Sequence, residues 1–207
     1  MRIVKNADER KNEILDAAER LFGTKGFDST STNDILNEIG IARGTLYYHF
    51  KSKEEILDSI IERLTRQLAN RAREFAEKKS VPVSKRLALV LLRLNAGSSN
   101  FTPKILEQVH KPQNALMHQK MQAQLSAELT PIISSLIKEG IALGIYETEY
   151  PEEAAEMMFL YANIVFDDLT GHSEAEKQKK TAAFVFNMER LLKTEQGSIW
   201  EIVEEII

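Results

Sequence analysis

Cysteine is absent from the 207-residue sequence, which excludes disulfide bonds and cysteine-ligated zinc or iron–sulfur centres. There is also no run of about 18 or more apolar residues, the length that a membrane-spanning helix needs. The N-terminus has neither the apolar stretch nor the small-residue cleavage site of a secretory signal. These absences predict a cytoplasmic protein that has no membrane partner.

Signatures of catalysis and of metal binding are missing as well. The sequence contains no nucleophile motif, no glycine-rich phosphate loop and no recognisable pair of catalytic carboxylates. His110, His118 and His172 lack a neighbouring histidine or carboxylate at a metal-ligand spacing. We therefore expect no enzyme, no cofactor and no metal site.

Charge is unevenly distributed along the chain. The net charge of −4 at pH 7 is unfavourable for binding nucleic acid, because phosphate contacts require lysine and arginine. Residues 1–53, however, carry a net charge of +1, whereas residues 54–207 carry −5. The segment 39–53 contains three basic residues and no acidic one, so a local positive field lies within an acidic chain.

Hydrophobic residues make up 43% of the sequence, enough for a sizeable core. They recur about every three or four positions almost throughout, and no strand-like alternation is present. The sequence thus predicts an all-α fold of about nine helices. We expect an N-terminal helix-turn-helix domain of three helices over residues 1–53 and a helical effector-binding and dimerisation domain over 54–207.

The N-terminal helices are bounded by clear capping signals. A first helix is expected over 8–23. Ser31, with Asp34 three residues later, is suited to cap a short second helix. Gly40 supplies the left-handed residue that ends it, and a third helix is expected over 43–49. Three short helices with a tight glycine turn between the last two are typical of a helix-turn-helix.

The boundaries of the later helices are also marked. Ser52 and Glu55 form a capping box at the start of a long fourth helix. Pro131 lies inside a helical pattern over 114–142, where it either kinks the helix or restarts it with Thr130 as the cap. Two long helices are expected near the C-terminus, over 151–170 and 173–195, followed by a tail with helical spacing that could pack on the body.

The third helix separates an apolar side from a polar side. Ala42, Leu46 and Phe50 follow one another at four-residue steps and are expected to seal the small core. The remaining side chains can project outward: Arg43, Gly44, Thr45, Tyr47, Tyr48 and His49. Phenol, imidazole and guanidinium groups donate hydrogen bonds to phosphates and base edges, so this side is suited to DNA.

The N-terminal residues carry a specific pattern: ILDAAERLF at 14–22, Gly26-Phe27, Ser31-Thr32 and ARGTLYYHFKSKEE at 42–55. This pattern resembles the DNA-binding domain of the TetR family over about a quarter of the chain. The resemblance implies phosphate contacts from Thr32, Tyr47, His49 and Lys53. It implies groove contacts from Asn33, Arg43, Gly44, Thr45 and Tyr48. Lys51 joins this predicted DNA-binding set, and a basic arm with Arg2 and Lys5 could add to it.

The rest of the chain resembles the C-terminal region of the family more loosely, best over 137–146 and 151–155. The family fold implies that the fourth to seventh helices enclose a ligand cavity and that the last two long helices form a four-helix dimer interface. The predicted interface residues are Ala155, Met158, Phe159, Ala162, Val165, Phe166, Leu169, Phe184, Met188, Leu191 and Leu192. The alternative is that this stripe forms only the core of one subunit.

Candidates for binding an effector are fewer and weaker. Met117 and Met121 lie four residues apart beside His118, and methionine adapts to an apolar ligand. Arg93, Phe101 and Tyr161 are further candidates. Ordinary core packing explains these residues at least as well.

Together these features predict a ligand-responsive transcriptional regulator, more specifically a repressor. It would bind a palindromic double-stranded operator as a homodimer and be released by a small-molecule effector, with the fourth helix as the lever. The alternative is a helical small-molecule binding or adaptor protein that has lost DNA binding. Repression rests on the resemblance, since no residue indicates the direction of regulation.

Overall fold

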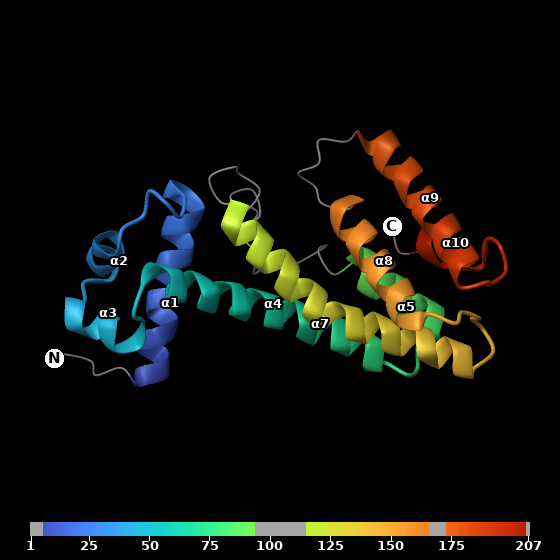
Figure 1. Cartoon of the computed structure of the whole chain (residues 1–207), viewed down its shortest axis with the longest axis horizontal. Coiled ribbons are helices and arrows are strands. Elements are labelled where there is room, and N and C mark those ends of the chain that lie inside the picture. The colour runs from blue at the N-terminus through green and yellow to red at the C-terminus, as the bar shows by residue number, and fades with distance from the viewer. Residues whose placement is uncertain (1–5, 94–114, 166–172, 206–207) are drawn as a thin grey trace. The chain divides into compact units, whose positions relative to one another are not determined.

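The computed structural model describes residues 6–93, 115–165 and 173–205 (Figure 1). All secondary structure in these residues is helical, so the all-α prediction is confirmed. The helices are α1 (Ala7–Lys25), α2 (Thr32–Ile39), α3 (Arg43–His49), α4 (Lys53–Glu77), α5 (Val83–Arg93), α7 (Ala115–Ala142), α8 (Pro151–Val165), α9 (Glu174–Leu191) and α10 (Ser198–Glu204).

The chain forms two compact units. Residues up to Thr65 belong to the first unit together with the start of α7, up to Gln124. The second unit contains the remainder of α4 and α7 with α5, α8, α9 and α10. Both α4 and α7 are therefore continuous helices shared by the two units. The domain boundary that we expect after residue 53 stays a prediction.

Helix α1 supplies much of the core of the first unit. Asn6 caps it through a hydrogen bond from the Glu9 N–H to its side chain (2.8 Å). Ile14 and Phe22 are buried on the inward stripe. The helix continues past the expected end at residue 23 and stops at Gly26, whose φ of 87° is left-handed.

Capping of α2 follows the prediction. The Ser31 hydroxyl accepts from the Asp34 N–H (3.1 Å), and the Asp34 carboxylate accepts from the Ser31 N–H (2.8 Å). Hydrogen bonds from Lys25 and then Ser31 hold the pKa of Asp34 well below its usual range. Gly40 ends α2 in the left-handed conformation (φ 65°, ψ 37°), and α3 has the predicted bounds.

The start of α4 matches only half of the predicted capping box. The Ser52 hydroxyl accepts from the Glu55 N–H (3.1 Å), as expected. The Glu55 carboxylate, however, accepts from the Lys51 N–H (2.6 Å) instead of the Ser52 N–H. The extended backbone at Phe50 ends α3 just before this point, which leaves the Lys51 N–H available.

Helix α7 continues without interruption through Pro131, so a restart of the helix with Thr130 as its cap is wrong. The Thr130 hydroxyl oxygen is buried and has no hydrogen-bond partner within the described residues. Pro131 lacks the N–H that would bond to the Ala127 carbonyl, but the helix is continuous on both sides of it.

Arg86 joins three elements of the second unit from a position that is only 2% exposed. Its guanidinium donates to the Ala76 carbonyl at the end of α4 (2.6 Å) and to the Val81 carbonyl (2.9 Å). It also donates to both carboxylate oxygens of Glu139 on α7, at 3.1 and 2.5 Å. Hydrogen bonds from Arg86 and then Lys79 lower the pKa of Glu139 from 4.5 to about 2.

A close contact with Tyr146 explains one glycine of α7. The Tyr146 ring is buried and its hydroxyl donates to the Ser84 hydroxyl at 2.9 Å. A Cβ atom on Gly140 would lie 2.0 Å from Cδ2 of that ring. Only glycine fits at this position while the ring keeps its place.

The C-terminal helices largely match the prediction. Helix α9 begins after Ser173, which caps it, and ends at Leu191, four residues before the expected residue 195. Lys193 breaks the helix there, since its φ is 48°. The tail forms α10, which packs on α5 and α9. The buried carboxylate of Glu189 accepts hydrogen bonds from N–H groups at the start of α10, including that of Ile199 (2.9 Å). The tail prediction is confirmed.

None of the described helices combines the length and apolar character that crossing a bilayer requires. Within the same residues, no group of three or more histidine, aspartate and glutamate side chains could hold a metal ion.

Candidate nucleic-acid interface

The inner side of α3 anchors the helix in the first unit. Leu46 and Phe50 are fully buried, as predicted. Ala42 is exposed, so its predicted place in this core is wrong. Ala42 precedes the helix in extended backbone (ψ 148°), and its methyl group therefore does not follow the helical spacing.

The outer side of α3 is open to solvent. Tyr48 is 80% exposed, and Arg43 and Gly44 are exposed beside it. Nothing lies within 4 Å of the position that a Cβ would take on Gly44, so another molecule can approach the backbone there. Thr45 and His49 are half-buried at the edges of this surface.

Tyr47 connects α3 with the start of α2. Its ring centroid lies 5.4 Å from the guanidinium carbon of Arg43, a cation–π contact within one helical turn. Hydrogen bonding to Thr32 and then to Arg43 lowers the pKa of the Tyr47 hydroxyl. The ring is 39% exposed, while Asn33, next to Thr32, is exposed. The structure thus brings these four predicted residues together.

Tyr48 and His49 form a second aromatic pair. Their ring centroids are 5.0 Å apart and the planes are nearly perpendicular, at 87°. This edge-to-face contact leaves the Tyr48 hydroxyl side open, consistent with the large exposure of the ring.

The two predicted lysines differ in their surroundings. Lys51 is exposed. Lys53 is half-buried, and its ammonium donates to the Phe27 carbonyl (2.8 Å) and lies 4.2 Å from the centroid of the Phe27 ring. Lys53 therefore fastens the loop after α1 to the start of α4. A phosphate contact by either lysine stays a prediction.

Ion pairs neutralise several basic side chains of α1. On α1, the basic side chains of Arg10, Arg20 and Lys25 pair with carboxylates. Arg43 and Lys51 have no carboxylate partner within the described residues. Their charges remain available to an anionic partner.

Most of the predicted dimer-interface residues lie inside the subunit. Seven are buried within it: Ala155, Met158, Phe159, Ala162, Phe184, Met188 and Leu192. The packing of α8 and α9 within one chain already buries these side chains, and their assignment to a surface between subunits stays a prediction. Leu191 is half-buried. The Val165 side chain, Phe166 and Leu169 lie outside the described residues.

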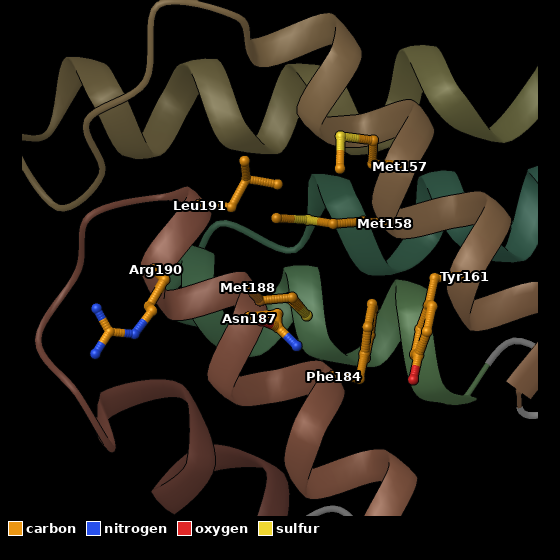
Figure 2. A pocket seen from close by; sticks show the side chains of 8 residues that line it. All are labelled: Met157, Met158, Tyr161, Phe184, Asn187, Met188, Arg190 and Leu191. Atoms are coloured by element: carbon orange, nitrogen blue, oxygen red, sulfur yellow. The ribbon is translucent and has the colours of Figure 1, made fainter.

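A different side of α8 and α9 is apolar and exposed. Met157 is 61% exposed, and Leu160, Tyr161 and Phe186 are also open to solvent. Figure 2 shows that side chains from both helices line a groove of about 500 Å³ on this side. In the groove the rings of Tyr161 and Phe184 stack with centroids 5.3 Å apart. We name Met157, Leu160, Tyr161 and Phe186 the outer apolar face.

The sequence prediction missed this face although a signal was present. Helix α8 has apolar residues on both its buried and its exposed sides, a width that exceeds the single stripe of an ordinary surface helix. Periodicity identifies such a helix as having two apolar sides, but it does not say which side faces the rest of the same subunit.

The predicted effector residues that the structure describes are divided between the two units. Met117 and Met121 are buried on the part of α7 that belongs to the first unit. His118, between them, is half-buried and lies 3.3 Å from the Gln122 amide. Tyr161 belongs to the outer apolar face instead. The Arg93 side chain and Phe101 lie outside the described residues, and the effector site stays a prediction.

Comparison with known families and relatives agrees with this geometry. Residues 14–60 match the family described as "Bacterial regulatory proteins, tetR family". Residues 97–186 match the family described as "Tetracyclin repressor-like, C-terminal domain".

Curated relatives include the fatty acid metabolism regulator protein of Bacillus subtilis, 32% identical over 64% of this chain and 68% of its own length. The HTH-type regulator YhgD of the same organism is 27% identical over 82% of this chain and 90% of its own length. Among solved structures, the B. subtilis transcriptional regulator FadR in complex with stearoyl-CoA is 26% identical, with a TM-score of 0.62 over 89% of this chain and 99% of that one. A putative TetR-family regulator from Mesorhizobium loti shares the fold (TM-score 0.67, 18% identity, covering 91% of this chain and 98% of that one).

The N-terminal helices and their exposed polar surface define a helix-turn-helix regulator. The chain belongs to the TetR family of transcriptional regulators. The sequence-based prediction of the family is confirmed, as is the prediction that the chain is not an enzyme, since the members of this family are transcriptional regulators.

Proposed function

We propose that the protein is a transcriptional repressor that binds a palindromic operator as a homodimer and leaves it when a small-molecule effector binds. The observation that supports this most directly is the outer side of α3, where Arg43, Tyr47 and Tyr48 are exposed next to one another. These are hydrogen-bond donors without acidic neighbours on α3, the combination that phosphates and base edges require.

Within this surface, two kinds of DNA contact are proposed. Thr32, Tyr47, His49, Lys51 and Lys53 would donate to phosphates. Asn33, Arg43, Gly44, Thr45 and Tyr48 would meet the major groove. Phosphate contacts set the position of the helix and contribute most of the salt-dependent affinity, while groove contacts distinguish base pairs.

The outer apolar face is the proposed dimer interface. Four large apolar side chains on two adjacent helices are exposed in a single subunit, and exposed apolar surface of this kind favours a contact with another protein. A two-fold contact through this face would also place a copy of α3 in each half of a palindrome.

The effector is proposed to bind within the second domain, residues 54–207. Long-chain acyl-CoA is the first class of compound to test, because the relative FadR was solved with stearoyl-CoA. Binding would favour a conformation with lower operator affinity, with α4 as the connecting element, since it is one unbroken helix from the end of the helix-turn-helix into the second unit.

A pair of matched variants tests the DNA-binding surface. Tyr48 and Tyr150 are both highly exposed, at 80% and 63%, but only Tyr48 lies on α3. A duplex selected by the protein from a random pool serves as the probe in a gel-shift titration.

Tyr48→Ala should weaken binding by about tenfold or more, the value of one good contact to DNA, whereas Tyr150→Ala should bind like the wild type. Equal affinity of both variants would overturn the assignment of the surface. Failure of the wild type to select any duplex would instead favour a small-molecule binding or adaptor protein.

A further inference from the structure

We propose that Tyr47 is a positioning residue that holds Arg43 in place to read one base pair in each half-site. This inference rests on the proposed function. It names the residue pair that determines which base the protein prefers at one position of the operator. It differs from the phosphate contact proposed for Tyr47 above, because a residue that orients a base-reading side chain changes base preference.

Arg43 occupies a position from which a base can be read. It is the first residue of α3 and it is exposed, and the N-terminal residues of a recognition helix contact base edges. Its guanidinium is not neutralised by a carboxylate of the described residues, in contrast to Arg10, Arg20 and Lys25 of α1. A planar guanidinium matches the O6 and N7 acceptors of guanine with two parallel hydrogen bonds.

Tyr47 limits where this guanidinium can go. Residues four apart on a helix lie on the same side, and the ring of Tyr47 is 5.4 Å from the guanidinium carbon of Arg43. Arginine otherwise samples many rotamers, so a fixed aromatic face reduces the entropy lost when the side chain meets its base.

The ring is itself supported from α2. Hydrogen bonding to Thr32, at the first position of α2, and then to Arg43 lowers the pKa of the Tyr47 hydroxyl, which indicates that the hydroxyl lies within reach of both side chains. The start of α2 is fixed in turn by the reciprocal Ser31 and Asp34 bonds and by the Lys25–Asp34 ion pair (2.9 Å). Support from two helices makes Tyr47 a rigid platform.

Tyr48 is the natural comparison, because it is a neighbouring tyrosine without this role. Its ring contacts only the edge-to-face partner His49 among the aromatic and cationic groups of the described residues. It is twice as exposed as Tyr47, 80% against 39%. Substitution of Tyr48 should therefore not affect the base that Arg43 reads.

The test measures base preference position by position. The probe is the duplex selected by the wild-type protein, with every base pair of one half-site changed in turn. The proteins compared are the wild type, Arg43→Met, Tyr47→Leu, the double variant, Tyr47→Phe and Tyr48→Leu, with Tyr150→Leu as the control outside the DNA-binding surface.

We expect the wild type to prefer guanine at one position by about tenfold or more. Arg43→Met and Tyr47→Leu should both lose that preference at the same position, and the double variant should resemble Arg43→Met alone. Tyr47→Phe should keep most of the preference because it retains the ring. If Tyr47→Leu destabilises the protein, Tyr47→Met provides the same information, since it fills a similar volume without an aromatic face and should also lose the guanine preference.

A different pattern would overturn the inference. If Tyr47→Leu lowers the affinity for all duplexes by one common factor and leaves the guanine preference intact, Tyr47 contacts phosphate only. If Arg43→Met keeps the preference, Arg43 does not read the base. Either result leaves DNA binding itself in place, whereas a wild type that selects no duplex would overturn the proposed function.

Discussion

Replacing Gly140 by alanine tests the packing of the second unit at a single atom. The new Cβ would lie 2.0 Å from Cδ2, 2.4 Å from Cε2 and 2.9 Å from Cγ of Tyr146. The ring cannot remain in place at these distances. Because Tyr146 is buried and its hydroxyl is bonded to Ser84 at 2.9 Å, moving the ring sacrifices both packing and a hydrogen bond.

The expected magnitude follows from opposing effects. Alanine stabilises a helix by about 1 kcal/mol relative to glycine. Overpacking costs about 1–3 kcal/mol, and loss of the bond to Ser84 costs about another 1 kcal/mol. Displacing a buried aromatic ring adds to these costs, so we expect a net destabilisation of about 2–3 kcal/mol. For a chain of this size that lowers Tm by about 5–10 °C.

Thermal unfolding followed by circular dichroism measures this directly. Gly44→Ala is the matched control, because the space around Gly44 is open and the same substitution should leave Tm unchanged or raise it slightly. The double variant Gly140→Ala/Tyr146→Leu should recover part of the loss by removing the clash. A Gly140→Ala protein as stable as the wild type would refute the described packing of Tyr146.

Other predictions concern charge and assembly. Arg86→Met should destabilise the fold by about 2–3 kcal/mol in urea titrations, because it removes the donor to the Ala76 and Val81 carbonyls and leaves Glu139 with Lys79 alone; a loss below about 1 kcal/mol would contradict this. The pKa of Glu139 is lowered from 4.5 to about 2, so its ionised form stabilises the fold fully above pH 4.5 and this contribution is lost as the pH falls towards 2. Over that interval the wild type should lose more stability than Glu139→Gln, and parallel pH profiles would argue against the ion pair. Met157→Glu should produce folded monomers in sizing chromatography while Tyr150→Glu stays dimeric, and a dimeric Met157→Glu protein would exclude the outer apolar face as the interface. Phe159→Glu should instead lower Tm, because it buries a charge.

Local signals allowed the N-terminal helices to be predicted closely. The Ser31 cap, the left-handed Gly40 and the bounds of α3 depend on residues within a few positions of one another. The exposed side of α3 could also be predicted from residues close in sequence, since Leu46 and Phe50 identify the buried side. Even here Ala42 was misassigned, because a residue before the first helical turn does not follow the helical period.

Features that depend on distant residues could not be predicted in the same way. The Arg86–Glu139 pair joins positions far apart in the sequence, and Lys53 is fastened to the carbonyl of Phe27 on another element. The exposed apolar side of α8 was not identified from the sequence because both sides of the helix are apolar. Periodicity does not distinguish a side that packs within a subunit from one that is available to a second copy.

The salt dependence of DNA binding tests the central claim, that the α3 surface meets phosphates. The effector-free protein should bind its selected duplex at low ionic strength, and the logarithm of its affinity should fall linearly with the logarithm of the salt concentration. Lys51→Gln should reduce the slope by about one, since it removes one exposed cation from that surface. No binding at low salt, or an affinity that does not change with salt, would contradict the account.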